Sequence, residues 1–331
     1  MRTLQFIICF FLIGITAFAQ PKFEPTNAAP GEFSRMGFLP RGIAMGNALS
    51  AVTTGNLSAY YNPALSVFQE DNYAEASYTF LSLDRHLNFV NFTRKFEFGA
   101  KDADGKPRAT AGFSIGLINS GVSNIDGRDN DDNPTGQLKT SENLLFFAFA
   151  NKFSKKVAIG FGARLYYYKL YEKITSTAVG FDLGVIYSVA DNVKVALVLQ
   201  DLNTTYKWDT SSLYSTNGLS TTDKFPTTKK IGVSYFVPSI NALFATELEF
   251  NSYGRRLLRL GGEYPVIPEL TVRGGFDNLV LNNGDELIQP TLGFAFNHHY
   301  SDKLSLCFNY AFAVEQYSQT PRHSIGVGFL F

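Results

Sequence analysis

Residues that usually carry catalysis or bind metals are scarce in this chain, whose 331 residues include 4 His and 2 Cys. Cys9 lies in an apolar leader, which leaves Cys307 without an intrachain partner in the expected mature chain. The histidines show none of the spacings typical of metal sites; they are His86, His298, His299 and His323. We therefore expect no disulfide, no metal site and no cofactor.

Charge is also sparse, because only 18% of residues are charged and 29 Lys and Arg balance 29 Asp and Glu. A surface that binds nucleic acid needs a strong basic excess, so a nucleic-acid partner is excluded. After the leader, no stretch approaches the roughly 18 consecutive apolar residues of a membrane helix. Aromatic residues nevertheless reach 15%. An apolar chain without a spanning helix is typical of a transmembrane β-barrel, in which every second residue faces lipid.

Signals of enzyme chemistry are weak. Gly112-Phe113-Ser114-Ile115-Gly116 matches the hydrolase pattern G-x-S-x-G, but that chemistry needs a sharp strand-to-helix turn, and these residues lie within an alternating strand. No phosphate-binding loop is present in the sequence. We predict that the chain is not an enzyme. The Asp- and Asn-rich loop 126–133 leaves two alternatives open, a calcium site or a solvated turn.

The two ends of the chain indicate export to an outer membrane. Arg2 precedes an apolar run from Leu4 to Phe18, and Ala17-Phe18-Ala19 has the small-x-small pattern of a cleavage site. We expect residues 1–19 to be a signal peptide, with Gln20 at the start of the mature chain. The last ten residues alternate, with Phe329 and Phe331 on the apolar face, as in the closing strand of an outer-membrane barrel.

Period-two runs bounded by turn residues predict an all-β fold, a barrel of about fourteen antiparallel strands over residues 72–331. The expected strands are 72–83, 86–98, 108–119, 142–153, 156–171, 176–189, 192–202, 228–238, 241–252, 256–265, 269–277, 290–300, 303–315 and 322–331. The long loops 120–141, 203–227 and 278–289 all follow odd-numbered strands, so we expect them at the extracellular end. The segment Gly99–Pro107 is an exception, because it is a longer loop at the inner end.

If the bulkier face of each strand meets lipid, a set of charged residues faces the lumen. These residues are Arg164, Asp182, Lys194, Glu247, Glu249, Arg259, Glu263 and Arg273. Hairpin symmetry about Lys173 and Tyr253 predicts two cross-strand ion pairs, Arg164–Asp182 and Glu247–Arg259. Pairing is expected because an unpaired buried charge costs several kcal/mol. The alternative to a filled lumen held by ion pairs is a polar track for a ligand.

Residues 20–71, called here the hatch segment, lack strand periodicity and precede the barrel. Small residues at 44, 48 and 51 would let a short helix pack closely against a wall, and Asn62-Pro63 predicts a turn. A compact segment of this kind fits inside the lumen as a plug. The motif residues that we expect there are Arg41, Gly42, Met45, Gly46, Asn62, Pro63 and Ala64.

The pattern of residues 41–64, Arg-Gly-x-Ala-Met-Gly followed by Tyr-Asn-Pro-Ala, resembles the amino-terminal hatch of the FadL superfamily of outer-membrane barrels. Later segments look like the PorV/PorQ branch found in Bacteroidetes; they are residues 180–187, 260–264 and 272–276. The resemblance implies a fourteen-stranded barrel with the hatch lodged in its lumen. In FadL-type transporters a disrupted third strand opens a lateral route; Gly112, Gly116 and Gly121 would permit such a kink here.

The PorV/PorQ resemblance implies an accessory role in type IX protein secretion and surface attachment, with other secretion-system components or exported proteins as partners. The alternative is a FadL-like transporter of hydrophobic small molecules gated by the hatch, with a hydrophobic ligand as its partner. Either function implies contact with outer-membrane lipid, in a Gram-negative cell of the Bacteroidetes type. Because both functions need the hatch, the motif itself does not separate them.

Overall fold

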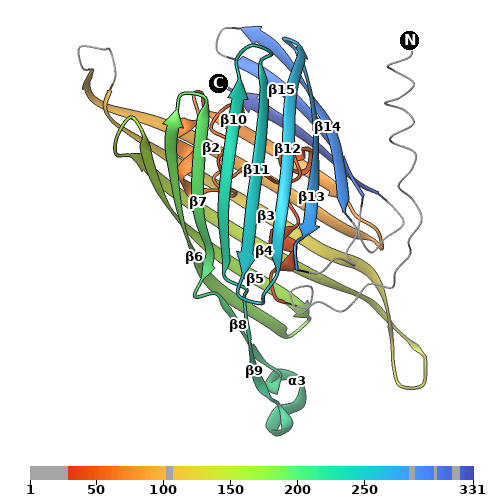
Figure 1. The fold of residues 1–331 in the computed structure, drawn as a ribbon. Helices are drawn as coiled ribbons and strands as arrows, with labels where there is room; N and C mark the ends of the chain where they lie inside the picture. Colours follow the sequence, from red (N-terminus) through yellow and green to blue (C-terminus); the bar gives the residue numbers. More distant parts are fainter. Residues whose placement is uncertain (1–28, 102–106, 283–287, 302–303, 315–320) are drawn as a thin grey trace, which may run out of the picture.

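The computed structural model describes residues 29–101, 107–282, 288–301, 304–314 and 321–331. Fourteen antiparallel strands form one closed barrel (Figure 1), as the alternating runs predict. The barrel closes where the first strand pairs with the last, from Tyr73 opposite Leu330 to Phe80 opposite His323. The predicted signal peptide lies outside the described residues.

The barrel strands follow one another around the wall, apart from one interruption between β7 and β10. They are β1 (Tyr73–Phe80), β2 (Arg85–Lys101), β3 (Pro107–Arg128), β4 (Pro134–Lys152), β5 (Val157–Tyr171), β6 (Ile174–Ala190), β7 (Val193–Leu202), β10 (Thr228–Val237), β11 (Ala242–Asn251), β12 (Arg256–Ile267), β13 (Leu270–Val280), β14 (Gln289–Ser301), β15 (Leu304–Ala313) and β16 (Arg322–Leu330).

Two groups of shorter elements complete the described chain. The hatch segment contains η2 (Glu32–Arg35), α2 (Pro40–Ala44) and η3 (Pro63–Phe68). Between β7 and β10 lie β8 (Thr205–Asp209), α3 (Ser211–Tyr214), η4 (Ser215–Asn217) and β9 (Ser220–Lys224). β8 and β9 pair as a separate two-stranded sheet that projects beyond the barrel (Figure 1), and we call residues 203–227 the arm. No helix in the described ranges is long and apolar enough to cross a membrane.

Bulky apolar side chains cover the outside of the wall, and small or polar ones face the inside. In β6, Val179, Phe181 and Leu183 are exposed, whereas Ala178 and Asp182 on the opposite face are buried. This alternation follows from the period of two in a strand. Closure of the barrel leaves no strand edge, so every strand can pair its backbone groups with its neighbours. The outward apolar side chains can then face lipid.

The longer connections follow odd-numbered strands of the barrel, as predicted, but one of the predicted loops is wrong. The arm, the β3–β4 turn and the β13–β14 connection all follow odd-numbered strands of the barrel. The predicted long loop 120–141 is wrong, because β3 and β4 stay paired as far as Arg128 and Pro134. Pairing resumes at Ile125 opposite Leu138 after an irregularity at Asn124, whose φ is 58°. The predicted inner loop falls largely on residues 102–106, outside the described ranges.

β3 is an unbroken part of the wall, in contrast to the lateral opening that the resemblance implies. It pairs with β2 from Phe98–Ala109 to Arg85–Val122 and with β4 from Thr110–Lys152 to Val122–Thr140. Its glycines provide room for neighbours. A Cβ on Gly112 would lie 2.2 Å from the backbone of Ser66, and one on Gly116 would lie 2.4 Å from the Phe146 ring.

Candidate functional site

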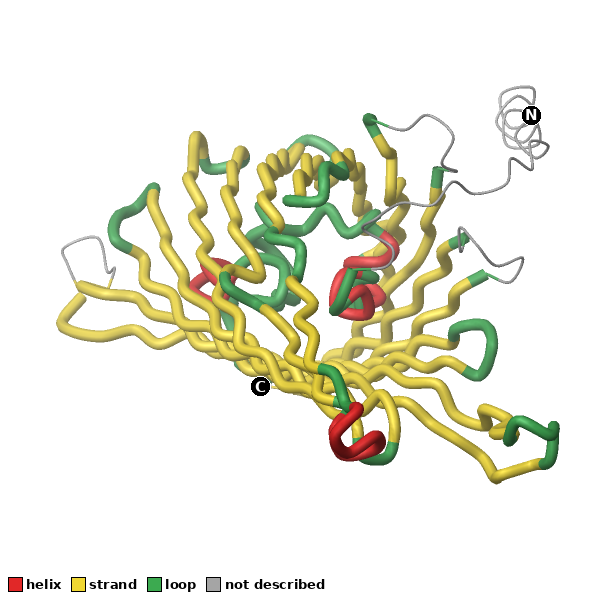
Figure 2. The backbone as a smooth tube through the Cα atoms, turned by 90° about the horizontal axis from the view of Figure 1, so that it is seen from below, coloured by secondary structure: helices red, strands yellow, loops and turns green. Residues whose placement is uncertain are grey.

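The described part of the hatch segment, residues 29–71, fills the lumen. Figure 2 shows its helices and loops within the ring of strands. It contributes Met45, Tyr61 and Leu65 to a buried cluster that also includes Phe89 and Phe146 from the wall. Because these side chains are almost fully buried, the segment packs against the wall as protein cores do.

Arg41 in α2 joins the hatch segment to the wall by a bidentate ion pair. Its Nε and Nη2 donate to the two carboxylate oxygens of Glu263 in β12, each at 3.0 Å. Its Nη1 donates to the carbonyl oxygens of Thr54 at 2.7 Å and Asn56 at 2.9 Å. The planar guanidinium suits this fork of acceptors, so Arg41 fixes both the helix and the following loop.

The glycines of the motif allow close approach. Gly46 has a φ of 57°, and a Cβ there would lie 2.5 Å from the carbonyl oxygen of Phe276. A Cβ on Gly42 would lie 1.8 Å from the Tyr61 hydroxyl. Met45 is fully buried, and its carbonyl lies against Gly261. The spacing of the small residues at 44, 48 and 51 predicts a helix that reaches residue 51, but the observed helix α2 ends at Ala44. It ends there because residues 46 and 47 both adopt positive φ.

Asn62, Pro63 and Ala64 begin η3 and lie against strands β5 and β6. The Asn62 Oδ1 accepts from the Ala64 backbone N–H at 2.9 Å, and Pro63 occupies the first turn. The Asn62 Nδ2 donates to the Ser50 carbonyl oxygen at 2.9 Å. A Cβ on Gly160 would lie 2.4 Å from the Ala64 nitrogen, and one on Gly184 would lie 1.9 Å from the Asn62 Oδ1.

The two predicted cross-strand ion pairs are both present. Arg164 Nε lies 2.5 Å from Asp182 Oδ2. This pair is diagonal, because the register places Arg164 opposite Gly180 and Asp182 opposite Gly162, two residues from the predicted pairing of Arg164 with Asp182. Glycine at both opposing positions leaves room for the diagonal contact. Glu247 and Arg259 are directly opposite, and their Oε1 and Nη1 lie 3.3 Å apart.

Arg259 is the centre of a larger charged network on strands β10–β13. Its Nη1 lies 2.5 Å from Glu249 Oε2, and its Nε lies 2.8 Å from Asp277 Oδ1. Lys230 Nζ lies 3.6 Å and 3.7 Å from carboxylate oxygens of Glu247 and Glu249. The network reaches the hatch segment through Asn47, whose Nδ2 donates to Asp277 Oδ2 at 2.7 Å.

The remaining predicted charges divide into two groups. Arg273 Nε donates to Glu263 Oε2 at 2.6 Å, so Glu263 bridges Arg273 and Arg41. Lys194 does not join the lumen charges. It lies beside the β6–β7 turn, and its Nζ donates to the carbonyl oxygens of Ala190 and Asp191, which are nearer than any carboxylate of the network.

Sequence reasoning missed several lumen residues. Glu75, Lys230 and Asp277 lie on the inward face of their strands and could have been found by alternation alone. Glu75 accepts hydrogen bonds from Tyr73 and Asn309. Asp201, which accepts from the Tyr166 hydroxyl at 2.6 Å, carries no such signal. Its φ of 58° and the register shift between β6 and β7 break the alternation there.

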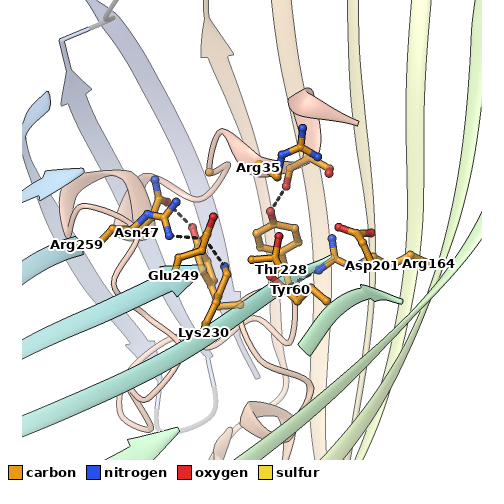
Figure 3. A pocket seen from close by; sticks show the side chains of 13 residues that line it. Arg35, Asn47, Tyr60, Arg164, Asp201, Thr228, Lys230, Glu249 and Arg259 are labelled. Atoms are coloured by element: carbon orange, nitrogen blue, oxygen red, sulfur yellow. Dashed lines mark hydrogen bonds and ion pairs between the residues drawn. The ribbon is translucent and has the colours of Figure 1, made fainter. Parts of the chain in front are cut away.

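A small polar cavity of about 20 Å³ lies between the hatch segment and the wall. Figure 3 shows Arg259, Asn47 and Lys230 on one side of it and Asp201 and Arg164 on the other. This volume suits about one water molecule. A larger solute does not fit in this cavity.

A wider vestibule opens on the side of the lumen where the arm lies. Its volume is 1720 Å³, and its lining combines hatch residues 29–36 with the arm and the ends of the neighbouring strands. The lining combines charged side chains, such as those of Glu142, Arg259 and Asp277, with aromatic ones from Tyr168, Tyr206 and Trp208. The rings of Tyr168 and Trp208 lie 5.4 Å apart, and Trp208 Nε1 donates to Asp223 Oδ2 at 2.7 Å.

The Asp-rich turn and the last strand lie away from the lumen. Arg128 Nε contacts Asp126 and its Nη1 contacts Asp132, at 2.9 Å and 3.2 Å. Backbone and side-chain hydrogen bonds from Asn133 lower the pKa of Asp129. In the described residues, no group of three His, Cys, Asp or Glu could hold a metal ion. Phe329 and Phe331 face outward at the barrel's closing seam, and Cys307 is buried on the inward face.

The barrel is similar in fold to solved channels and transporters. It aligns with the CymD monoaromatic hydrocarbon channel at a TM-score of 0.56 and 13% identity, covering 88% of this chain and 96% of that one. It aligns with the toluene transporter TodX of Pseudomonas putida at a TM-score of 0.57 and 13% identity, covering 89% and 99%. It also aligns with a Pseudomonas aeruginosa FadL homologue at a TM-score of 0.51 and 11% identity, covering 88% of this chain and 96% of that one.

These likenesses establish a shared barrel fold. Because the sequence identities are this low, they establish nothing about the ligand or partner. No model of a known protein family matches the chain. No curated protein matches it either.

Proposed function

We propose that this chain is an outer-membrane channel for small hydrophobic molecules, closed by its hatch segment in the state described. The observation that carries the proposal is the vestibule of 1720 Å³, which ends at the hatch segment and whose mixed lining includes a cluster of aromatic rings from Tyr168, Tyr206 and Trp208. Such a ring cluster in a concave site offers a contact surface to a small apolar ligand. The class of ligand is suggested by solved channels of the same fold, which are named for monoaromatic hydrocarbons and toluene, and it is part of the proposal.

Passage in this proposal is axial. β3 is paired on both sides, so a ligand that enters the vestibule meets the hatch segment rather than a gap in the wall. The cavity of about 20 Å³ between the hatch segment and the wall is too small for a hydrocarbon. Transport therefore requires movement of the hatch segment, and capture in the vestibule comes first.

Toluene uptake tests the proposal. Cells that produce the chain should accumulate labelled toluene faster than cells with an empty vector. The double variant Trp208→Ala/Tyr168→Ala should reduce this gain about tenfold, because it removes two rings from the vestibule wall. Tyr235→Ala, on the outward face, is the matched control and should keep the gain. Equal uptake with and without the chain, across several apolar compounds, would contradict the proposal.

A second candidate is the accessory role in type IX secretion implied by the PorV/PorQ resemblance. Two observations favour it: the ion-paired packing of the lumen, and the arm, where Tyr214 and Leu219 are 63% and 75% exposed. Exposed apolar residues on a projecting element are typical of protein contacts. Deletion of the gene in its native host separates the candidates. Loss of surface proteins with unchanged uptake of apolar compounds supports secretion and contradicts the channel.

A further inference from the structure

Three asparagines form a continuous row on the outside of the barrel. The register places Asn88 of β2 opposite Asn119 of β3, and Asn119 opposite Asn143 of β4. Asn88 Nδ2 donates to Asn119 Oδ1 at 3.2 Å, and Asn119 Nδ2 donates to Asn143 Oδ1 at 2.8 Å. Asn143 Nδ2 then donates to Ser141 Oγ at 3.2 Å. We call Asn88, Asn119, Asn143 and Ser141 the amide row.

The row faces away from the lumen. The residues next to it in each strand, Leu87, Ile118 and Leu144, are fully buried against the hatch segment and the core. Because successive residues of a strand point to opposite faces, the three amides point outward. None of them takes part in the charged network or the vestibule described above.

The row lies at the edge of the apolar surface. On the side away from the arm, the next outward residues are Val90, Leu117 and Leu145, all apolar. On the other side, β3 and β4 continue into a polar hairpin. Tyr78 and Tyr167 lie at the two ends of the row, opposite Asn88 and Asn143, and are 41% and 44% exposed. Tyrosines of this kind are typical of the membrane–water interface.

The chemistry of the row suits a sugar. Each asparagine amide can donate two hydrogen bonds and accept two, and the bonds within the row use only part of this capacity. Hydrocarbon offers no partner for the rest, and burying an amide without hydrogen-bond partners is unfavourable. Sugar hydroxyls both donate and accept. Lys169, directly opposite Ser141, adds one cation that suits a phosphate.

We propose that the amide row, with Lys169, binds the sugar–phosphate head group of a glycolipid in the outer leaflet. This inference depends on the membrane placement in the proposed function, but not on transport of apolar molecules. It assigns a task to outward residues that neither the hatch segment nor the vestibule uses. It also places the outer boundary of the hydrocarbon at the level of Asn88, Asn119 and Asn143.

The experiment titrates purified, folded full-length protein in detergent with bacterial lipopolysaccharide and counts bound glycolipid by native mass spectrometry. The wild type should bind lipopolysaccharide and gain thermal stability. The triple variant Asn88→Leu/Asn119→Leu/Asn143→Leu should lose at least tenfold in affinity. Asn151→Leu, outward on the same strand β4 near its opposite end, should bind as the wild type does.

Three further outcomes separate the alternatives. Lys169→Gln should weaken binding of lipopolysaccharide while leaving binding of a neutral glycolipid unchanged, since only the first carries phosphate. Equal affinity of the triple variant and the wild type would overturn the proposal. A triple variant that changes the oligomeric state instead, with unchanged glycolipid binding, would make the row a protein contact and would also overturn it. Toluene uptake by the triple variant should equal that of the wild type.

Discussion

The two ends of the described hatch segment meet the wall by different physical means. Residues 40–50 are held by charge and polar contacts, through Arg41 to Glu263 and through Asn47 to Asp277. Residues 45 and 46 also lie close to the wall at Gly261 and Gly275, whereas the described contacts of residues 62–67 with the wall are close packing against Gly112, Gly160 and Gly184. A charged contact can be released by losing one partner, whereas a close fit fails only if the shapes change. The difference suggests that residues 40–50 are the part of the hatch segment that can be released.

Arg41→Leu should have the largest effect on this comparison. It leaves the carbonyls of Thr54 and Asn56 without their donor and Glu263 with one partner fewer. Removing one member of a buried ion pair costs about 3–5 kcal/mol. Hydrogen exchange of residues 40–50 should therefore accelerate by at least about a hundredfold. Arg94→Leu, outside the lumen, is the control. Unchanged exchange in Arg41→Leu would mean that charge does not hold this end.

Gly160→Ala should have the next largest effect, because the new Cβ would lie 2.4 Å from the backbone of residues 63 and 64. Overpacking of this kind costs about 1–3 kcal/mol. We expect a lower thermal midpoint and faster exchange in residues 62–67, with residues 40–50 less affected. Gly274→Ala is the matched control, since its Cβ meets its nearest neighbour at an ordinary 3.5 Å. Equal midpoints for the two variants would contradict a close fit at Gly160.

Asn62→Ala should have a smaller effect, about 1 kcal/mol, because it removes the N-cap of η3. Asn62→Asp sharpens the test. It keeps an acceptor for the Ala64 N–H and loses the donor to the Ser50 carbonyl. If the cap matters most, the Asp variant should exchange more slowly at residues 62–67 than the Ala variant. The reverse order would assign the larger role to the bond with Ser50, which joins the two ends of the segment.

The β3–β4 turn should show the smallest effect and a pH dependence. Hydrogen bonds from Asn133 lower the pKa of Asp129, so the ionised carboxylate stabilises the folded turn. This stabilisation is present above the usual aspartate pKa of about 3.9 and is lost as pH falls through the lowered value. Amide exchange of residues 129–133 should rise only in acid. In Asp129→Ala, amide exchange of these residues should already be raised at neutral pH. Exchange that is independent of this carboxylate, with the same pH dependence in the wild type and the variant, would contradict the prediction.

Alternation was sufficient to predict the barrel and much of the lumen. It correctly placed Arg164, Asp182, Glu247 and Arg259 in the lumen, because successive side chains of a regular strand point to opposite faces of the sheet. It failed at Asp201 and in the β3–β4 extension, where positive φ at Asp201 and Asn124 changes the phase. It also could not show what the inward glycines accommodate. Gly112, Gly160 and Gly184 appear in the sequence as gaps in a pattern, and only the position of residues 62–67 explains them.

The pairing of β1 with β16 has a consequence for biogenesis. Residue 72, just before β1, exchanges backbone hydrogen bonds with Phe331 at the very end of the chain. The wall is thus closed by pairing between its first and last strands. Once these two edges have met, no gap between strands remains for the hatch segment, so a later entry would have to pass through an end of the barrel. The moment of closure therefore decides the route by which the hatch segment reaches the lumen.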